Sequence, residues 1–234
     1  MSTEFAGLKA GTYTLAEVQQ LGWQQTAPGG NGTYSGIVII SGTNATGYDF
    51  GNFLKGKISG YKFNDLNGNG TWDNGEPVLS GWKINLSGPL TGSAVTDANG
   101  YYEFTNLTVG TYSLAEVLQS GWQQTHAPGN VNVVSGTNST HNDFGNFQLG
   151  KISGHKYNDI NGNGTKEQNE PYLSGWKINL GGAGQASAVT DANGYYEFTG
   201  LKAGTYTLAE VLQAGWQQTA APGNVNVVSG TNSQ

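Results

Sequence analysis

Short runs of alternating apolar and polar residues recur along this chain and predict β-strands. The run 82–86 reads Trp-Lys-Ile-Asn-Leu and the run 112–116 reads Tyr-Ser-Leu-Ala-Glu, so each presents one apolar and one more polar face. The sequence Asp-Ala-Asn-Gly at 97–100 separates two further runs and is typical of a hairpin turn. Strands at roughly 8–12-residue spacing predict an all-β chain of antiparallel β-sandwiches.

The pattern returns after 94 residues. Gly-Lys-Ile-Ser-Gly begins at Gly56 and again at Gly150, and Thr-Asp-Ala-Asn-Gly-Tyr-Tyr-Glu-Phe begins at Thr96 and again at Thr190. Self-similarity at a fixed period indicates tandem domains, and the very short linkers predict a stiff rod. The chain then divides into residues 1–54, the C-terminal half of a repeat; residues 55–149, a complete repeat; and residues 150–234, a repeat without its last strand.

Composition excludes several classes of function. The chain has 38 glycines, no cysteine, 11% charged residues and a net charge of −6. The lack of a basic cluster argues against nucleic acid or an anionic membrane as a partner, and no apolar run is long enough for a membrane-spanning helix. The three histidines are not spaced as a catalytic or metal set. We therefore do not expect an enzyme that acts on an external substrate.

One motif in each of the two later units predicts a calcium site. Residues 65–76 and 159–170 both fit D-x-[DN]-x-[DN]-G-x5-E, which places oxygen ligands around Ca²⁺. The alternative, a polar turn that happens to carry acids, is disfavoured by two complete matches. Strands rather than helices flank the motif, so calcium is expected to stiffen the domain rather than to signal. The predicted ligands are Asp65, Asn67, Asn69, Thr71, Asp73 and Glu76, and Asp159, Asn161, Asn163, Thr165, Glu167 and Glu170.

The parity of side chains along the strands brings a lysine, a glutamate and an asparagine into the core. Residues two apart on a strand share a face. Lys62, Glu116 and Asn146 each lie at even spacing from an apolar residue of their own strand, so all three are predicted to face inward. The corresponding residues are Lys156 and Glu210 in the last unit and Glu17 and Asn52 in the first fragment.

Such a trio has a chemistry of its own. Burial drives a lysine toward its neutral, nucleophilic form and a glutamate toward its protonated form. The lysine could then attack the asparagine carboxamide and expel ammonia, which leaves an isopeptide crosslink formed by single-turnover self-catalysis. The alternative, equally open on parity alone, is a Lys–Glu ion pair whose asparagine only donates a hydrogen bond, or a lysine that extends to solvent at the strand end.

Several motifs together resemble the SdrD B-like repeats of microbial surface proteins, which are relatives of the collagen-adhesin B-type (Cna-B) domains. The resemblance covers nearly the whole chain and implies prealbumin-like (Ig-like) sandwiches, EF-hand-like calcium loops, an extracellular location at the cell surface and a role as a stalk or adhesive rod. The motifs are Asp-x-Asn-x-Asn-Gly at 65–70, Glu-Pro-x-Leu-Ser-Gly-Trp at 76–82, Asp-Ala-Asn-Gly at 97–100 and Gly-Thr-Tyr-x-Leu-Ala-Glu at 110–116.

The resemblance also implies a crosslink from a first-strand lysine through a middle-strand glutamate to a last-strand asparagine. Lys62, Glu116 and Asn146 lie on the matching predicted strands. The spacing of Lys62 from the calcium motif departs from the usual Cna-B arrangement, so calcium and crosslink can be alternative stiffening devices.

The register of the repeat leaves one further hypothesis. Head-to-tail complementation, in which residues 48–52 of one chain complete the last unit of another, would give a filament that a Lys156–Asn52 bond could seal. Against this, residues 4–47 would duplicate strands that the last unit already has. The duplication favours the interpretation that the chain is a stretch of a longer array.

Two classes of function remain. In the first, the chain is a calcium-stiffened stalk or filament whose partners are copies of itself. In the second, it is an adhesin that holds a host protein or glycan. Adhesion requires unit-specific loops, whereas these units differ chiefly in the loop 28–40, which favours the scaffold. Trp23, Trp122 and Trp216, which recur in Gly-Trp-Gln-Gln-Thr, are predicted to be packing residues rather than a sugar platform.

Overall fold

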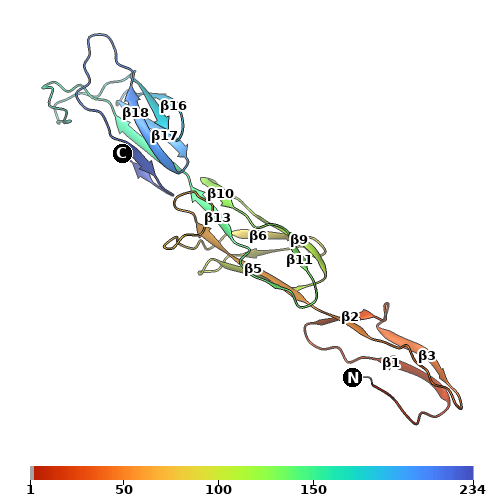
Figure 1. Cartoon of the computed structure of the whole chain (residues 1–234). Helices are drawn as coiled ribbons and strands as arrows, with labels where there is room; N and C mark the ends of the chain where they lie inside the picture. The colour runs from red at the N-terminus through yellow and green to blue at the C-terminus, as the bar shows by residue number, and fades with distance from the viewer. Residues whose placement is uncertain (1–2, 234) are drawn as a thin grey trace.

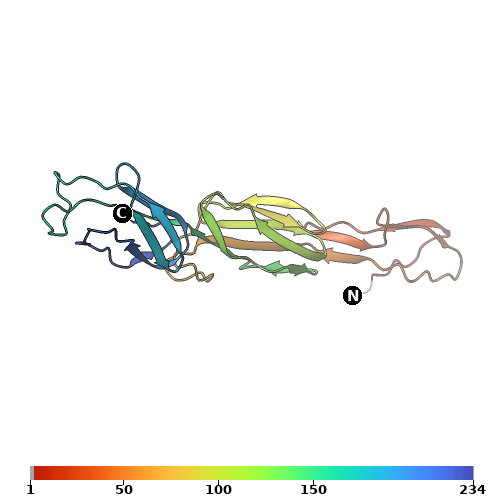
Figure 2. The ribbon, with the colours of Figure 1, turned by 90° about the horizontal axis from the view of Figure 1, so that it is seen from above.

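The computed structural model describes residues 3–233, which form strands, turns and loops and no helix. Three groups of strands follow one another in a line (Figure 1), and the view turned by 90° shows the same extended shape (Figure 2). The molecule is therefore a rod, and the all-β prediction is confirmed. We call the groups the first unit (residues 3–54), the middle unit (residues 55–149) and the third unit (residues 150–233). No helix among the described residues is long and apolar enough to span a membrane.

The middle unit is a sandwich of two sheets. In one sheet β10 pairs with β13, and β5 pairs with three strands: β13, β12 and β8. The second sheet has the order β11-β9-β6-β7. Apolar side chains from both sheets form one buried core between them, as the alternating runs predict. The strands are β5 (Gly56–Asn64), β6 (Lys83–Ser87), β7 (Gly92–Val95), β8 (Tyr101–Leu107), β9 (Gly110–Glu116), β10 (Trp122–His126), β11 (Val131–Val133), β12 (Asn138–Ser139) and β13 (Phe144–Gln148).

β13 lies between β5 and β10 and closes the middle unit. It runs parallel to β5, with Phe144 opposite Lys62, and antiparallel to β10, with Asn146 opposite Gln124. A parallel neighbour requires a long connection, which the chain between β5 and β13 provides. The sequence pattern identified these strands but not this parallel pairing.

The third unit repeats most of this arrangement. Its sheets have the orders β17-β14-β20 and β16-β15-β18-β19, and a second apolar core lies between them. Residues 211–224, which correspond to the region of β10, form no strand. The strands are β14 (Gly150–His155), β15 (Lys177–Gly182), β16 (Ala186–Val189), β17 (Tyr195–Leu201), β18 (Gly204–Glu210), β19 (Val225–Val227) and β20 (Asn232–Ser233).

The first unit is not a sandwich with a core. It consists of two separate two-stranded sheets, β1-β3 and β2-β4. Ile37 is the only buried residue among residues 3–54, because the strands that would cover these sheets in a complete repeat are not part of this unit. The strands are β1 (Gly11–Ala16), β2 (Trp23–Ala27), β3 (Thr33–Ile39) and β4 (Gly51–Leu54).

Neighbouring units are joined by packing as well as by the chain. Phe147 of β13 is buried in the core of the third unit, and Phe53 of β4 packs against the core of the middle unit. At the second junction the Ser229 amide donates to Leu66 O, at 3.0 Å, and the Gln148 amide donates to Ser229 Oγ, at 2.7 Å. These contacts fix the direction in which one unit continues into the next.

Candidate crosslinking and calcium sites

Lys62 and Glu116 meet in the core of the middle unit. The Lys62 Nζ atom lies 3.0 Å from Glu116 Oε2, and the two side chains are 0% and 3% exposed. Lys62 therefore does not extend to solvent, which removes one of the alternatives left open by parity. The Nζ atom also lies 4.6 Å from the ring centroid of Trp82, where the aromatic face attracts the cation.

Asn146 completes the trio from β13. Because β13 pairs in parallel with β5 and Asn146 is opposite Asn64, its side chain lies on the same face of the sheet as that of Lys62 and one diagonal step away. Asn146 is fully buried. The tertiary structure thus brings together three residues that lie on three different strands.

The polar atoms of this trio are poorly satisfied. Lys62 Nζ and Glu116 Oε2 contact each other as an ion pair. Lys62 Nζ, both Glu116 carboxylate oxygens, and Asn146 Nδ2 and Oδ1 are buried without a hydrogen-bond partner. A buried polar group left without any partner, as in Asn146, costs about 1–3 kcal/mol. In the alternative that parity left open, Asn146 would donate a hydrogen bond to a Lys–Glu ion pair; the structure contains the ion pair but not the hydrogen bond.

The environment of Lys62 shifts its side chain toward the neutral, unprotonated amine. Desolvation by burial lowers its pKa to about 8, although the charge of Glu116 opposes the shift. With a pKa of about 8, about a tenth of such lysines are unprotonated at pH 7, and only the unprotonated amine is a nucleophile.

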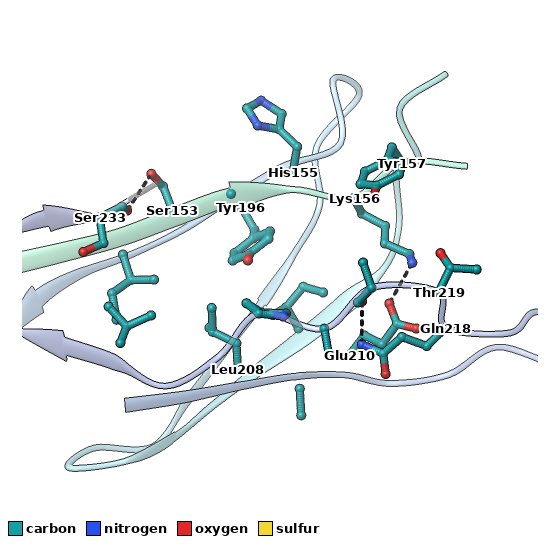
Figure 3. Close-up of a pocket in the computed structure, with 18 residues that line it drawn as sticks. Ser153, His155, Lys156, Tyr157, Tyr196, Leu208, Glu210, Gln218, Thr219 and Ser233 are labelled. Carbon is teal, nitrogen blue, oxygen red and sulfur yellow. Dashed lines mark hydrogen bonds and ion pairs between the residues drawn. The ribbon is translucent and has the colours of Figure 1, made fainter. Parts of the chain in front are cut away.

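The third unit holds the corresponding pair at the edge of a pocket (Figure 3). Lys156 Nζ lies 2.8 Å from Glu210 Oε2, with the side chains 17% and 7% exposed, and 4.7 Å from the ring centroid of Trp176. The pocket, of about 360 Å³, is lined by both residues and by Tyr157, Tyr196 and the segment 218–222. Lys156 is more exposed than Lys62 because no strand of the described chain covers it as β13 covers Lys62.

The first unit contains the other two members of a trio. Asn52 Nδ2 donates to Glu17 Oε2 at 2.8 Å in an exposed setting. The three units thus hold Glu–Asn, Lys–Glu–Asn and Lys–Glu sets in order along the rod, and only the middle unit holds a complete one.

The motif at 65–76 folds into a compact loop at the junction with the third unit (Figure 1). The Asp65 carboxylate accepts from the backbone N–H groups of Gly68, Asn69 and Gly70 at 2.7–3.1 Å. Glu76 accepts from the Leu66 amide at 2.8 Å and therefore joins the two ends of the loop.

The motif at 159–170 has the same internal bonds. Asp159 accepts from the Gly162, Asn163 and Gly164 amides, and Glu170 accepts from the Ile160 amide at 2.9 Å. The pKa of Asp159 is lowered, because hydrogen bonds from Thr219 and the loop backbone outweigh the opposing desolvation.

The donor set of the two loops suits calcium. Carboxylate, amide and main-chain oxygens are the ligands that Ca²⁺ takes, and the backbone bonds hold the carboxylates at both ends of each loop. Within residues 3–233, no three His, Cys, Asp or Glu side chains converge closely enough to form an all-ionisable metal cluster. Amide and main-chain oxygens would therefore have to supply much of the coordination.

Two residues near the lysines were not anticipated from the sequence as part of the site. The rings of Trp82 and Trp176 each lie against the lysine of their unit. Trp122 packs edge-on against Trp82, with 5.5 Å between ring centroids, and Trp216 packs in the same way against Trp176, with 5.4 Å between centroids. Trp122 and Trp216 thus make packing contacts of the predicted kind, although Trp216, like Trp23, is 39% exposed. The signal for Trp82 and Trp176 was their recurrence in the motif Leu-Ser-Gly-Trp.

Curated proteins of two staphylococcal species are similar in sequence to this chain. Serine-aspartate repeat-containing protein F of Staphylococcus epidermidis is 27% identical over 266 residues, which cover 98% of this chain and 15% of that protein. Serine-aspartate repeat-containing protein D of Staphylococcus aureus strain Newman is 28% identical over 206 residues, which cover 79% of this chain and 16% of that protein. The chain therefore spans about a sixth of the length of these relatives.

Among solved structures, the minor pilin GBS52 of Streptococcus agalactiae aligns with a TM-score of 0.35 and 14% identity, over 75% of this chain and 92% of that chain. The shaft pilin SpaA of Lactobacillus rhamnosus GG aligns with a TM-score of 0.32 and 11% identity, over 76% and 96%. The sequence profile of the SdrD B-like domain matches residues 56–155 and 148–232. This chain belongs to the SdrD B-like family, a family of repeat domains and not of enzymes.

Proposed function

We propose that this chain is a calcium-stiffened stalk of a microbial cell surface whose middle unit is locked by a Lys62–Asn146 isopeptide bond. The observation that carries the proposal is the buried trio, because five of its polar atoms have no hydrogen-bond partner. Burying a lysine and a glutamate in a core costs desolvation free energy, which their mutual attraction offsets only when further hydrogen bonds are present. Bond formation removes the charge of the lysine and relieves part of this cost.

The reaction balances within the trio. Proton transfer within the Lys62–Glu116 pair gives a neutral amine, whose Nζ attacks Asn146 Cγ while Glu116 donates the transferred proton in a hydrogen bond to Asn146 Oδ1 and so polarises the carbonyl. Glu116 then carries a proton from Nζ to Nδ2. The Cγ–Nδ2 bond breaks, ammonia leaves, and the Nζ–Cγ amide remains.

Calcium in the loop 65–76 would stiffen the rod between units. Leu66 belongs to this loop, and its carbonyl accepts the Ser229 amide of the third unit. A cation that fixes the loop therefore fixes one side of the junction. Asp65 and Glu76 would hold the ion at the two ends of the loop, and Asn67, Asn69, Thr71 and Asp73 would supply the remaining oxygens.

The repetition of the units favours a scaffold over an adhesin for a host protein or glycan. The middle and third units share the strand order of one of their two sheets, their Lys–Glu pair and their loop bonds. A surface location fits the relatives, which are serine-aspartate repeat-containing proteins of staphylococci.

The intact mass of the purified chain tests the proposal. One crosslink lowers the mass by about 17 Da, the mass of the ammonia released. Digestion should then yield a branched peptide that joins the segments around Lys62 and Asn146. An unshifted mass of the folded chain would disprove the crosslink, and a branched peptide from other residues would disprove its assignment.

A further inference from the structure

The two candidate sites of the middle unit are joined through the main chain. The Asp65 amide donates to Asn146 O at 2.8 Å, so the first predicted calcium ligand is bonded directly to the residue that the lysine would attack. Both residues are fully buried. Because this bond continues the pairing of β13 with β5, in which Asn146 is opposite Asn64, a displacement of Asp65 also displaces this part of β13.

The far end of the loop returns to the strand that carries Lys62. The Asn64 amide donates to Pro77 O, directly after the last predicted ligand, at 2.8 Å. The Leu79 amide donates to Lys62 O, also at 2.8 Å. The loop is therefore bonded to β13 where it begins and to β5 where it ends, and these two strands carry the residues that have to react.

The loop also lies against β10, the other neighbour of β13. A Cβ added to Gly70 would come within 3.0 Å of Thr125 O, so the loop backbone approaches the strand backbone closely there. Thr125 lies between the two residues of β10 that pair with Gly145 and Asn146. The loop therefore contacts both of the strands between which Asn146 is held.

The third unit has the same connection between its loop and its lysine. The Leu173 amide donates to Lys156 O and the Asn158 amide donates to Pro171 O, both at 2.9 Å. The two loops differ in sequence at several positions between their shared ligands. The recurrence of these bonds indicates that they belong to the repeat and not to one local sequence.

Charge makes the shape of the loop 65–76 depend on a cation. The loop carries three carboxylates, of Asp65, Asp73 and Glu76, and no lysine, arginine or histidine. Like charges at short distance repel, and a bound cation removes the repulsion. Without a cation we expect the loop to widen, and its bonded ends then hold β5 and β13 less exactly.

The crosslinking reaction is sensitive to such placement. Lys62 Nζ has to reach Asn146 Cγ in the correct direction, and a misplacement of about 1 Å can slow a reaction about 100-fold. The reacting residues come from different strands, so no single stretch of chain sets their separation. The bonds between the loop and these strands therefore bear directly on the rate.

We propose that the loop 65–76 positions Lys62 and Asn146 for their reaction, so that the middle unit crosslinks rapidly only when the loop holds calcium. The inference rests on the proposed function and adds the regulation of its bond-forming step. The bonds made and broken, and the ammonia released, are those of the reaction described above. Extracellular calcium modules bind with a Kd of about 10⁻⁴–10⁻³ M. With an affinity in this range, the chain would stay open where free calcium is scarce and would lock where it is abundant.

The experiment follows the intact mass of the full chain with time. The chain is synthesised in a cell-free system with chelator and then divided between chelator, calcium and magnesium, all with sucrose to favour the folded state. The loss of about 17 Da should be on the order of 10–100-fold faster in calcium than in chelator. Magnesium, which requires near-octahedral geometry and gives up water reluctantly, should not replace calcium.

Glu76→Gln and Glu170→Gln form a matched pair of variants. Each glutamate accepts two backbone amides of its own loop. Glu76→Gln should crosslink slowly at calcium concentrations that suffice for the wild type, whereas Glu170→Gln should keep the wild-type rate. Equal rates in the two variants overturn the positioning by the loop 65–76.

Calcium binding supplies a readout that does not involve the reaction rate. If bound calcium favours the crosslinked arrangement, the crosslink must in turn favour calcium binding. By calorimetry, the crosslinked wild type should bind calcium at the loop 65–76 at least about 5-fold more tightly than Asn146→Ala does. The affinity of the loop 159–170 should be the same in both chains. Equal affinities at both loops overturn the coupling.

The outcomes separate this inference from the proposed function. A mass that decreases equally fast in chelator and in calcium overturns the coupling and leaves the crosslink standing. A mass that never decreases disproves the crosslink and the inference with it. Circular dichroism that shows the chelated chain to be unfolded in sucrose also overturns the inference, because calcium would then act on folding and not on placement.

Discussion

Lys62 Nζ lies 3.0 Å from Glu116 Oε2, and neither side chain is more than 3% exposed. A buried ion pair usually needs further hydrogen bonds to offset the loss of hydration. Here both carboxylate oxygens and the nearby Asn146 amide are without hydrogen bonds. This shortage distinguishes the site from a structural salt bridge.

Glu116→Gln should abolish the crosslink. A glutamine is close in size but cannot exchange protons between the amine and the carboxamide, so the intact mass of the variant should show no loss of ammonia. Glu103→Gln is the matched control, because Glu103 pairs with Lys57 on the surface of the same unit. The prediction fails if the Glu116 variant retains the branched peptide, or if the control loses it.

Asn146→Ala should make the stability of the middle unit depend on pH. The variant cannot crosslink but keeps Lys62, whose pKa is lowered by burial from 10.5 to about 8. Between these values the unfolded chain binds more protons than the folded one, so the free energy of unfolding should rise with pH. The increase should be on the order of 1 kcal/mol per pH unit.

Urea unfolding at a series of pH values measures this dependence. The series should stop near pH 10, because burial raises the pKa of Tyr102 and its titration acts in the opposite direction above its ordinary value of 10.0. The double variant Lys62→Met/Asn146→Ala should lose the rise. An equal rise in both variants would show that another group is responsible.

Calcium should stabilise the chain through its two loops. A ligand bound only to the folded state at 100 times its Kd adds about 2.7 kcal/mol. Chelation should therefore lower the melting temperature, and Glu76→Gln should remove the part of the effect due to the middle unit. Glu76 closes its loop through the Leu66 and Asp73 amides. Glu197→Gln, outside the loops, should respond to calcium as the wild type does.

Gly145→Ala should destabilise the middle unit and reduce crosslinking together. A Cβ at this position would clash with the Phe63 ring and push β13 away from β5. Overpacking of this kind typically costs about 1–3 kcal/mol. Gly129→Ala is the control, since nothing lies within 4 Å of its added Cβ. Thermal unfolding and intact mass measure both effects, and equal behaviour of the two variants would refute the packing argument.

Much of the fold followed from the sequence because it depends on local pattern. Period-two alternation at 82–86 and 112–116 identified β6 and β9, and the turn at 97–100 joined β7 to β8. The 94-residue repeat indicated serial units, and parity indicated that Lys62 and Asn146 face inward. The family followed from motifs at fixed spacing.

Other features depended on contacts between distant segments. The parallel pairing of β13 with β5, the unsatisfied atoms around Glu116 and the rings of Trp82 and Trp176 above the lysines are not encoded in any one run of residues. In the first unit, which the repeat predicts to be the C-terminal half of a repeat, only Ile37 is buried. Parity can place a side chain on a face, but it cannot say whether another sheet covers that face.

The sequence by itself therefore determined the strands, the repeat, the loops with their oxygen donors and the identity of the residues that can react. Only the tertiary structure decided which of them meet. Lys62 and Lys156 occur in equivalent positions of the repeat, yet one is sealed beneath β13 and the other lies at the edge of a pocket. The physical reason is that burial is set by what packs over a residue, and β13 joins its sheet from more than 75 residues further along the chain.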